Sequence, residues 1–202
     1  MVGAVRRGAS AEWVVVGLGN PGAEFRHTRH NLGADTVELL SARHHQRLRA
    51  ERGTRSVSAE VRMDAHAVVL AVPQTYMNES GLAVGALLRR YGPVTVDRLV
   101  VVHDELDLPV GRVKVKVGGG TAGHNGLRSV HAHLHDEGYL RVRIGIGKPP
   151  GRRQGTDHVL RPPGKAERDA LAAAVEVAAD AVEAIVEHGP EAAMTRVNAE
   201  PA

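Results

Sequence analysis

The sequence predicts a single-domain α/β protein with three layers, in which a mixed, mainly parallel, twisted sheet lies between two layers of helices. Short apolar runs alternate with segments of helical periodicity along nearly the whole chain, as in folds whose strands are connected by helices. One pair of apolar runs is separated by only a few polar residues, which predicts a hairpin and therefore an antiparallel strand. With 202 residues, the chain fits one domain.

Strand and helix signals alternate through the first half of the chain. Each predicted strand is a short apolar run, and each predicted helix carries apolar residues three and four positions apart. The first strand runs into a glycine-rich turn at Gly17, and Gly92-Pro93 ends the second helix. In order, the predicted elements are a strand at 14–16, a helix after Asn31, strands at 56–63 and 67–72, a helix at 79–91 and a strand at 98–103.

Two strands in the second half are expected to present basic side chains. Between residues 111 and 117 valines alternate with basic residues, so Lys114 and Lys116 should share one face. A second strand carries Arg141 and Arg143 on one face in the same way, and we expect the two basic faces to lie near each other. The other predicted elements are a short helix from about Leu127, a strand at 140–146, a mobile loop at 149–164 and a long alanine-rich helix at 165–188.

Composition excludes several classes of protein. The chain has no cysteine, which excludes disulfides, thiolate nucleophiles and cysteine-ligated zinc. It has no apolar run long enough to span a membrane and no signal sequence at its start, so we expect a cytoplasmic protein without a membrane partner. The formal charge of +3 slightly favours a polyanionic partner. We expect residues 1–12 to form a disordered extension before a folded domain at 13–199.

The glycine-rich turn at 17–22 has the spacing of a dinucleotide-binding fingerprint, GxGxxG after a strand. Three features argue against that function. Pro21 stiffens the turn, the predicted helix begins too late to receive a pyrophosphate on its N-terminus, and no acidic residue follows a strand at the usual spacing. A tight structural turn is the simpler interpretation, and a nucleotide-dependent oxidoreductase is a less favoured alternative.

One histidine and one group of acidic residues are candidates for catalysis. His30 precedes a predicted helix and lies beside the glycine turn, and Asp104 belongs to an acidic segment, 103–107, that follows an apolar strand. An aspartate in that position can orient an imidazole that acts as a general base. An acidic loop without a chemical role, or a divalent-cation site, remains an alternative. No serine or cysteine accompanies the pair, so water is the expected nucleophile.

Three asparagines lie in predicted loops at strand ends: Asn20, Asn78 and Asn125. Asparagine amides can donate hydrogen bonds to a developing oxyanion or hold the amides of a peptide. Taken singly, an asparagine in such a loop is more often a turn or helix-cap residue, because asparagine tolerates left-handed backbone and caps helices. The remaining histidine groups, at 44–45 and 131–135, do not have the spacing of metal ligands on one helix face and are predicted to be surface residues.

Taken together, these segments resemble the bacterial peptidyl-tRNA hydrolase family, in the same order and from about Trp13 to Ala199. This family cleaves the ester that joins a peptide to its tRNA. The resemblance implies a monomeric enzyme without a metal or cofactor, whose partner is peptidyl-tRNA, bound at its acceptor stem and terminal adenosine. The matching segments are GLGNPG at 17–22, TRHN at 28–31, PQTYMN at 73–78, HDELD at 103–107, the glycine loop at 118–126 and RVRIGIG at 141–147.

The resemblance also implies roles for individual residues. His30 would be the proton acceptor that activates water, Asp104 would keep its imidazole basic, and Asn20 would help to separate blocked from free aminoacyl-tRNA. The residues that would hold the peptide and the terminal nucleotide are Phe25, Tyr76, Asn78 and Asn125. The candidate phosphate contacts are Lys114, Lys116, Arg141 and Arg143.

The chain departs from the family pattern at Phe25, where the family usually has tyrosine. Phenylalanine loses a hydroxyl group but keeps a stacking face, so we expect the site to survive. A non-catalytic RNA-binding protein on the same fold is the main alternative, because fold alone does not determine function. The presence of Asn20, His30 and Asp104 argues against that alternative.

Overall fold

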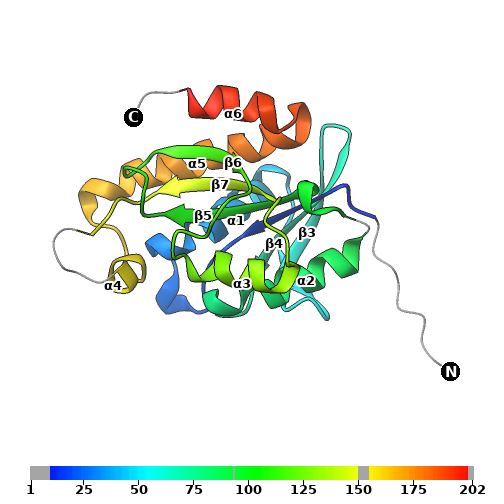
Figure 1. The fold of residues 1–202 in the computed structure, drawn as a ribbon, viewed down its shortest axis with the longest axis horizontal. Helices are drawn as coiled ribbons and strands as arrows, with labels where there is room; N and C mark the ends of the chain where they lie inside the picture. The colour runs from blue at the N-terminus through cyan, green and yellow to red at the C-terminus, as the bar shows by residue number, and fades with distance from the viewer. Residues whose placement is uncertain (1–9, 93, 150–154, 200–202) are drawn as a thin grey trace.

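The fold is built around one seven-stranded sheet (Figure 1). The computed structural model describes residues 10–92, 94–149 and 155–199. The strand order is β2-β3-β4-β1-β5-β7-β6; the three central pairs are parallel and the three outer pairs are antiparallel, which confirms the predicted mixed sheet. The strands are β1 (Trp13–Gly17), β2 (Arg49–Glu51), β3 (Ser56–Met63), β4 (His66–Pro73), β5 (Leu99–Glu105), β6 (Val113–Val117) and β7 (Leu140–Gly145).

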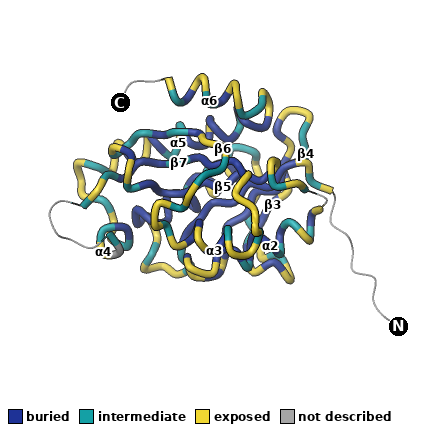
Figure 2. The backbone as a smooth tube through the Cα atoms, in the orientation of Figure 1, coloured by how far each residue is buried: buried dark blue, intermediate teal, exposed yellow. Residues whose placement is uncertain are grey.

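Helices cover both faces of the sheet, as predicted (Figure 1). Helices α2 (Ser80–Tyr91) and α3 (Asn125–Leu134) lie on one face, and α1 (Leu32–Arg43), α5 (Lys165–His188) and α6 (Pro190–Asn198) lie on the other. The central strands are buried along their length (Figure 2). No helix among the described residues is both long enough and apolar enough to span a membrane.

The core consists of two apolar layers, one on each side of the sheet. In β1, Val15 belongs to the layer under α1 and α5, whereas Val14 and Val16 belong to the layer under α2 and α3. Burial on both faces explains why the central strands are continuous apolar runs rather than alternating ones. The parallel strands β1, β4, β5 and β7 all end at the same edge of the sheet, where side chains that follow them can meet.

Two glycines allow helix α1 to pack directly on this edge. A Cβ atom on Gly33 would lie 2.2 Å from the carbonyl oxygen of Val102, and one on Gly17 would lie 2.1 Å from the carbonyl oxygen of Gly33. A larger residue at either position would push the helix away from β1 and β5. The close contact therefore determines where the 3₁₀ turn η2 (Arg29–Asn31), which immediately precedes α1, is placed.

The structure differs from the predicted elements in four places. Strand β2 is not predicted because it has only three residues, two of them exposed, and these show no periodicity. Helix α6 follows α5 after Gly189, whose positive φ of 87° ends one helix, while Pro190 begins the next. Part of the predicted mobile loop at 149–164 forms a short helix, α4 (Gly155–Val159), and residues 150–154 lie outside the described residues. Strand β5 continues to Glu105, so Asp104 and Glu105 lie within the strand rather than in a loop after it.

The predicted N-terminal extension falls mostly outside the described residues, which begin at Ser10. Its last residue, Glu12, contacts strand β4. The carboxylate of Glu12 accepts hydrogen bonds from the backbone N–H of Ala67 and from Nδ1 of His66, and its own N–H donates to the carbonyl of Ala67.

His103, near the end of β5, is a fully buried titratable residue. Its Nδ1 donates a hydrogen bond to the carbonyl oxygen of Asp104 at 2.7 Å, and its Nε2 has no partner among the described residues. Burial, together with the neighbouring His124, lowers the pKa of His103 to about 3. The imidazole is therefore neutral in the folded protein at neutral and mildly acidic pH.

This burial predicts a loss of stability in acid. In the unfolded chain a histidine has a pKa near 6.5, so between about pH 6.5 and pH 3 the unfolded state binds the proton and the folded state does not. The free energy of unfolding should fall as the pH falls through this window, by up to about 1.4 kcal/mol per pH unit from His103. We expect His103→Asn, measured by urea denaturation at several pH values, to have a flatter dependence between pH 6 and pH 4.

The matched control is His135→Asn, because His135 is exposed and has a positive φ of 53° that asparagine tolerates. It should keep the wild-type dependence. If His103→Asn also keeps that dependence, burial of His103 does not cause the acid sensitivity.

Candidate functional site

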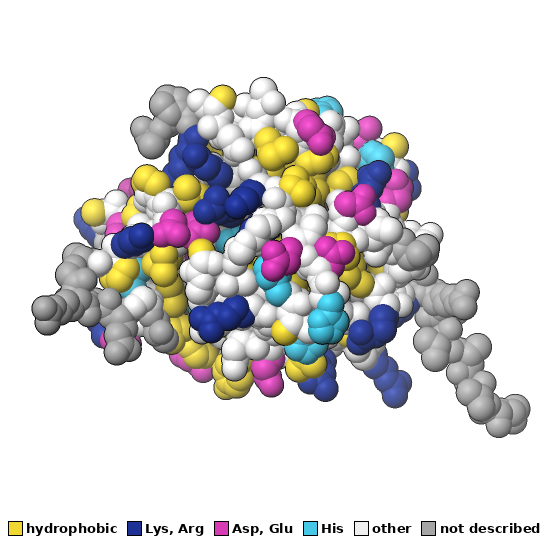
Figure 3. Space-filling model, viewed as in Figure 1, with side chains coloured by type: hydrophobic (Ala, Val, Ile, Leu, Met, Phe, Trp, Pro, Cys, Tyr) yellow, Lys and Arg dark blue, Asp and Glu magenta, His cyan; other side chains and the backbone are white. Residues whose placement is uncertain are grey.

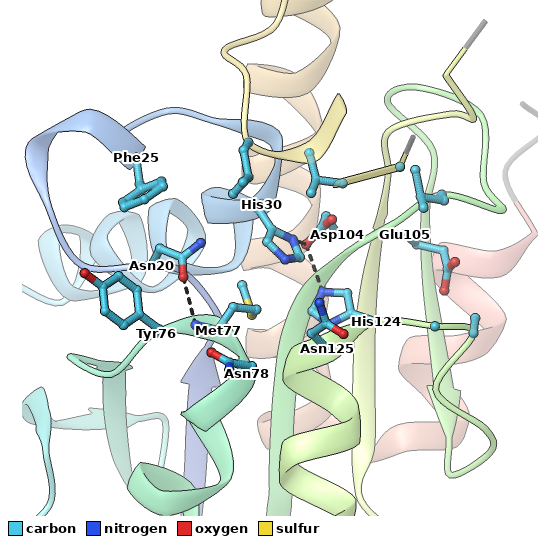
Figure 4. Close-up of a pocket in the computed structure, with 16 residues that line it drawn as sticks. Asn20, Phe25, His30, Tyr76, Met77, Asn78, Asp104, Glu105, His124 and Asn125 are labelled. Atoms are coloured by element: carbon cyan, nitrogen blue, oxygen red, sulfur yellow. Dashed lines mark hydrogen bonds and ion pairs between the residues drawn. The ribbon is translucent and has the colours of Figure 1, made fainter. Parts of the chain in front are cut away.

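A cleft of about 640 Å³ lies at the edge of the sheet where the parallel strands end. Loops after β1 and β4, the end of β5, the start of α3 and helix α4 form its walls (Figure 4). The cleft brings together seven of the residues that the sequence singled out: Asn20, Phe25, His30, Tyr76, Asn78, Asp104 and Asn125. Lys114, Lys116, Arg141 and Arg143 do not line it.

At the centre of the cleft, two imidazoles share one carboxylate oxygen. Nδ1 of His30 lies 2.8 Å from Oδ1 of Asp104, and Nε2 of His124 lies 3.0 Å from the same oxygen (Figure 4). The ring centroids of the two histidines are 4.9 Å apart. His30 comes from η2, Asp104 from β5 and His124 from the residue before α3, so three separate parts of the chain meet here.

Helix capping determines which nitrogen of His124 carries the proton. Its Nδ1 accepts hydrogen bonds from the backbone N–H groups of Gly126 and Leu127, at 3.1 and 3.3 Å, and so caps the N-terminus of α3. An accepting nitrogen is unprotonated, so the proton of the neutral ring is on Nε2 and is donated to Asp104. His124 is therefore a hydrogen-bond donor to the carboxylate.

The carboxylate in turn determines the tautomer of His30. Burial alone would raise the pKa of Asp104, but His30 and His124 beside it hold that pKa well below its usual range. The ionised carboxylate accepts a hydrogen bond from the N–H at Nδ1 of His30, so the proton of the neutral ring is on Nδ1 and a lone pair is left on Nε2. This second nitrogen has no hydrogen bond to any described residue, and the ring lines the cleft. Nε2 of His30 is thus available to take a proton from a water molecule in the cleft.

The same three side chains offer ligand atoms within 4.8 Å of one another, which is close enough for a metal ion. The protonation state of His124, with its proton on Nε2, does not suit a metal ion at this position. A histidine that binds a metal normally donates its other ring N–H, whereas Nδ1 of His124 accepts two backbone hydrogen bonds. Metal binding at Nε2 would require the cap of α3 to break, so hydrogen bonding describes this cluster better than metal coordination does.

Asn20 is oriented by a hydrogen bond that uses its amide oxygen. Oδ1 of Asn20 accepts from the backbone N–H of Met77 at 2.8 Å, which turns the amide NH₂ group toward the cleft (Figure 4). The backbone of Asn20 is held by the side chain of Asn31 through two hydrogen bonds of 2.9 Å. Asn20 consequently presents two donors and no acceptor to a bound molecule.

The other predicted contact residues surround this donor. Asn78, from the turn η3 (Met77–Glu79), and Asn125, the first residue of α3, are exposed side chains at the cleft. The rings of Phe25 and Tyr76 lie on the same side of the cleft as Asn20 (Figure 4). Tyr76 is 59% exposed, which is unusual for a large aromatic side chain and leaves its face free to stack.

Arg29, the residue before His30, contacts the segment 158–162, which belongs to another wall of the cleft. Its guanidinium donates to three backbone carbonyls between residues 158 and 162 and forms an ion pair with Glu167. Val159, from this segment, lines the cleft. Arg29 is buried, so its charge is compensated by these contacts rather than by water. It holds this wall of the cleft beside His30.

The predicted pairing of two basic strands is confirmed, since β6 and β7 are antiparallel neighbours with Lys114 opposite Arg143 and Lys116 opposite Arg141. Figure 3 shows Lys and Arg side chains gathered over this part of the molecule. Lys114 and Lys116 form no ion pair with the residues that the structure describes, whereas Arg143 pairs with Glu105, whose carboxylate lies 3.1 Å from Nε of Arg143.

Arg141 does not fit the predicted phosphate contact. It is 2% exposed, and its guanidinium donates to the carbonyl of Gly120 at 2.9 Å and also to that of Gly118. The glycine loop folds over this arginine, so Arg141 supports the loop that leads to His124. Alternation correctly placed Arg141 on the same face as Arg143 but could not show that a loop covers it.

The sequence is similar to those of known proteins. A family model described as peptidyl-tRNA hydrolase matches residues 14–202. A peptidyl-tRNA hydrolase of Cutibacterium acnes is 44% identical over 94% of this chain and 99% of its own length, and one of Mycobacterium tuberculosis is 47% identical over 92% and 97%.

The fold is also similar to that of solved structures. A crystal structure of peptidyl-tRNA hydrolase from Acinetobacter baumannii superposes with a TM-score of 0.88, at 35% identity, and covers 95% of this chain and 97% of that one. Fold, sequence and family model agree: the chain belongs to the peptidyl-tRNA hydrolase family.

Proposed function

We propose that the protein hydrolyses the ester bond between the peptide and the tRNA of peptidyl-tRNA, with His30 as the general base. The observation that carries the proposal is the free Nε2 of His30, which lines the cleft while Nδ1 is held by the buried carboxylate of Asp104. Membership of the peptidyl-tRNA hydrolase family supports the choice of substrate.

In the proposed reaction, a water molecule transfers a proton to Nε2 of His30 as its oxygen attacks the ester carbonyl. A tetrahedral intermediate forms, and the bond between the carbonyl carbon and the ribose oxygen then breaks. The proton on Nε2 passes to the departing ribose oxygen, which restores neutral His30 and releases tRNA and a peptide with a free carboxyl group. The negative charge of Asp104 stabilises the imidazolium between these steps.

Neutral donors in the cleft suit an N-blocked substrate. The NH₂ group of Asn20 can donate to a carbonyl of the peptide, and Asn78 and Asn125 can donate to the oxyanion or to neighbouring amides. A free aminoacyl-tRNA would instead bring a charged amine toward donors that cannot accept its protons, and desolvation of that amine is unfavourable. We therefore propose that Asn20 contributes to discrimination against free aminoacyl-tRNA.

The tRNA part of the substrate would lie toward β6 and β7. Lys114, Lys116 and Arg143 supply positive charge there, and phosphate groups are recognised largely by such charge. Phe25 and Tyr76, which lie beside Asn20 on the side of β1 and β4, would pack against the peptide residue that is esterified to the tRNA. We propose that the protein acts as a monomer, since one chain supplies every residue named above, and that it acts in the cytoplasm, as the proposed peptidyl-tRNA substrate suggests.

Replacement of His30 tests the function directly. We expect the wild-type protein to cleave N-acetyl-aminoacyl-tRNA, and His30→Ala to lose about 10²- to 10⁴-fold in kcat, because a general base contributes about that much. Affinity for tRNA should stay within a few fold, since the base adds little to ground-state binding. The measurement is release of the N-acetyl-amino acid in single-turnover and steady-state assays.

His135→Ala, at an exposed histidine outside the cleft, is the control and should behave like the wild type. Near wild-type turnover in His30→Ala would refute the assignment of the base. A wild-type protein that binds tRNA without cleaving the ester would favour the non-catalytic RNA-binding alternative.

Loss of the basic side chains should have an electrostatic signature. We expect Lys116→Ala and Arg143→Ala each to raise KM for full-length peptidyl-tRNA and to reduce its salt dependence by about one phosphate contact, with kcat nearly unchanged. A minimal peptidyl-adenosine ester, which lacks the acceptor stem, should be cleaved at the wild-type rate. If both variants affect the two substrates equally, at two salt concentrations, these residues do not contact phosphate.

A further inference from the structure

A second groove of about 620 Å³ lies at the same edge of the sheet as the cleft. It is bounded by helix α1, the loop before β2, the start of β3 and the end of β4. Its floor includes the apolar side chains of Leu48, Val57 and Val72, and two exposed arginines, Arg26 and Arg47, line it. Its volume is within the range of about 300–1,000 Å³ that is typical of ligand sites.

The groove and the catalytic cleft adjoin along two loops. Asn20 lines both of them. In the loop after β1, Phe25 lines the cleft and the next residue, Arg26, lines the groove. In the loop after β4, Gln74 lines the groove and Tyr76 lines the cleft. A molecule that leaves the cleft past Asn20, between the rings of Phe25 and Tyr76, would therefore enter the groove.

The order of the strands indicates which part of the substrate this would be. Along the sheet, the groove lies at β3 and β4, the cleft at β1 and β5, and the basic side chains at β7 and β6. An ester bound at His30 has RNA on one side of its carbonyl and peptide on the other. If the RNA extends toward β6 and β7, the peptide must extend the opposite way, toward β3 and β4.

We infer that this groove binds the part of the peptide that lies beyond the residue esterified to the tRNA. The inference rests on the proposed function, and it adds a binding site for the peptide chain away from the reacting ester. The apolar floor would bury peptide side chains of varied sequence. Arg26 and Arg47 give the groove a positive charge that only one lining acid, Glu38, opposes, so acidic peptide residues should bind better than lysines.

Two substrates separate the groove from the cleft: N-acetyl-aminoacyl-tRNA, and the same aminoacyl-tRNA extended by three further residues and then acetylated. We expect the longer substrate to have a kcat/KM higher by at least about fourfold, the effect of burying about one methylene group. Ala42 is exposed on α1 and lines the groove, so Ala42→Trp should fill it and remove this gain. Cleavage of the short substrate should be unchanged.

Charge reversal provides a second test that does not depend on packing. In the wild type, a longer substrate with glutamates should be preferred over one with lysines, by about two- to fivefold per charge for exposed pairs. The double variant Arg26→Glu with Arg47→Glu should reverse this preference. The control is Arg62→Glu, which changes the charge of an exposed arginine on β3 outside the groove and should keep the wild-type preference.

The possible outcomes distinguish failure of this inference from failure of the proposed function. If the wild type does not cleave the short substrate, the proposed function fails and the inference fails with it. If the wild type cleaves both substrates with equal kcat/KM, only the inference is overturned. It is also overturned if Ala42→Trp slows both substrates equally while keeping the wild-type melting temperature, or if Arg62→Glu alters the charge preference as strongly as the double variant does.

Discussion

The carboxylate of Asp104 is the group on which the cleft depends. It is buried at the end of β5, where an isolated negative charge would be costly, and the hydrogen bonds from His30 and His124 compensate it. Both histidines donate to one oxygen, so each ring is fixed in orientation and in tautomer. The reactive nitrogen of His30 is free because its other nitrogen is committed to this carboxylate. The chemistry of the site therefore follows from a charge that the fold has removed from water.

The fold provides this arrangement through contacts made far apart in the sequence. Gly17 and Gly33 allow α1 to lie directly on β1 and β5, which places His30 at the end of β5. Arg29, the residue before His30, binds the backbone of residues 158–162, which belong to another wall of the cleft. Arg141 supports the glycine loop from which His124 emerges. Arg29 and Arg141 are buried side chains. They position the reacting groups, but they do not line the cleft themselves.

The sequence predicted the central part of the fold well, because strands buried on both faces appear as uninterrupted apolar runs. It also predicted that His30 and Asp104 could meet, since both follow strands or turns that end at one edge of a parallel sheet. Strand β2 could not be predicted, because its three residues, two of them exposed, have no periodicity and pair only with β3.

Two residues, one in the cleft and one that supports a loop beside it, have roles that the sequence did not predict. His124 was not predicted, although it lies within the glycine loop that carries the family resemblance, because its role arises from capping α3, and histidine is not among the usual capping residues. Arg141 was predicted to be a phosphate contact, but it is buried under the glycine loop. Alternation along a strand indicates which face a side chain occupies but not whether a loop covers that face. Both errors concern contacts between a loop and a distant element, which local sequence patterns do not encode.

The dependence of kcat/KM on pH in Asp104→Asn, with N-acetyl-aminoacyl-tRNA as substrate, tests the role of this carboxylate most directly. The substitution keeps the shape of the side chain and removes its charge, which would no longer stabilise an imidazolium at His30. We expect the plateau to fall by about 10²- to 10⁴-fold and the acidic limb of the profile to move to lower pH. Asp107→Asn, at an exposed aspartate that pairs with Lys148, should leave the profile unchanged. A wild-type plateau and an unmoved acidic limb in Asp104→Asn would contradict the central role of Asp104.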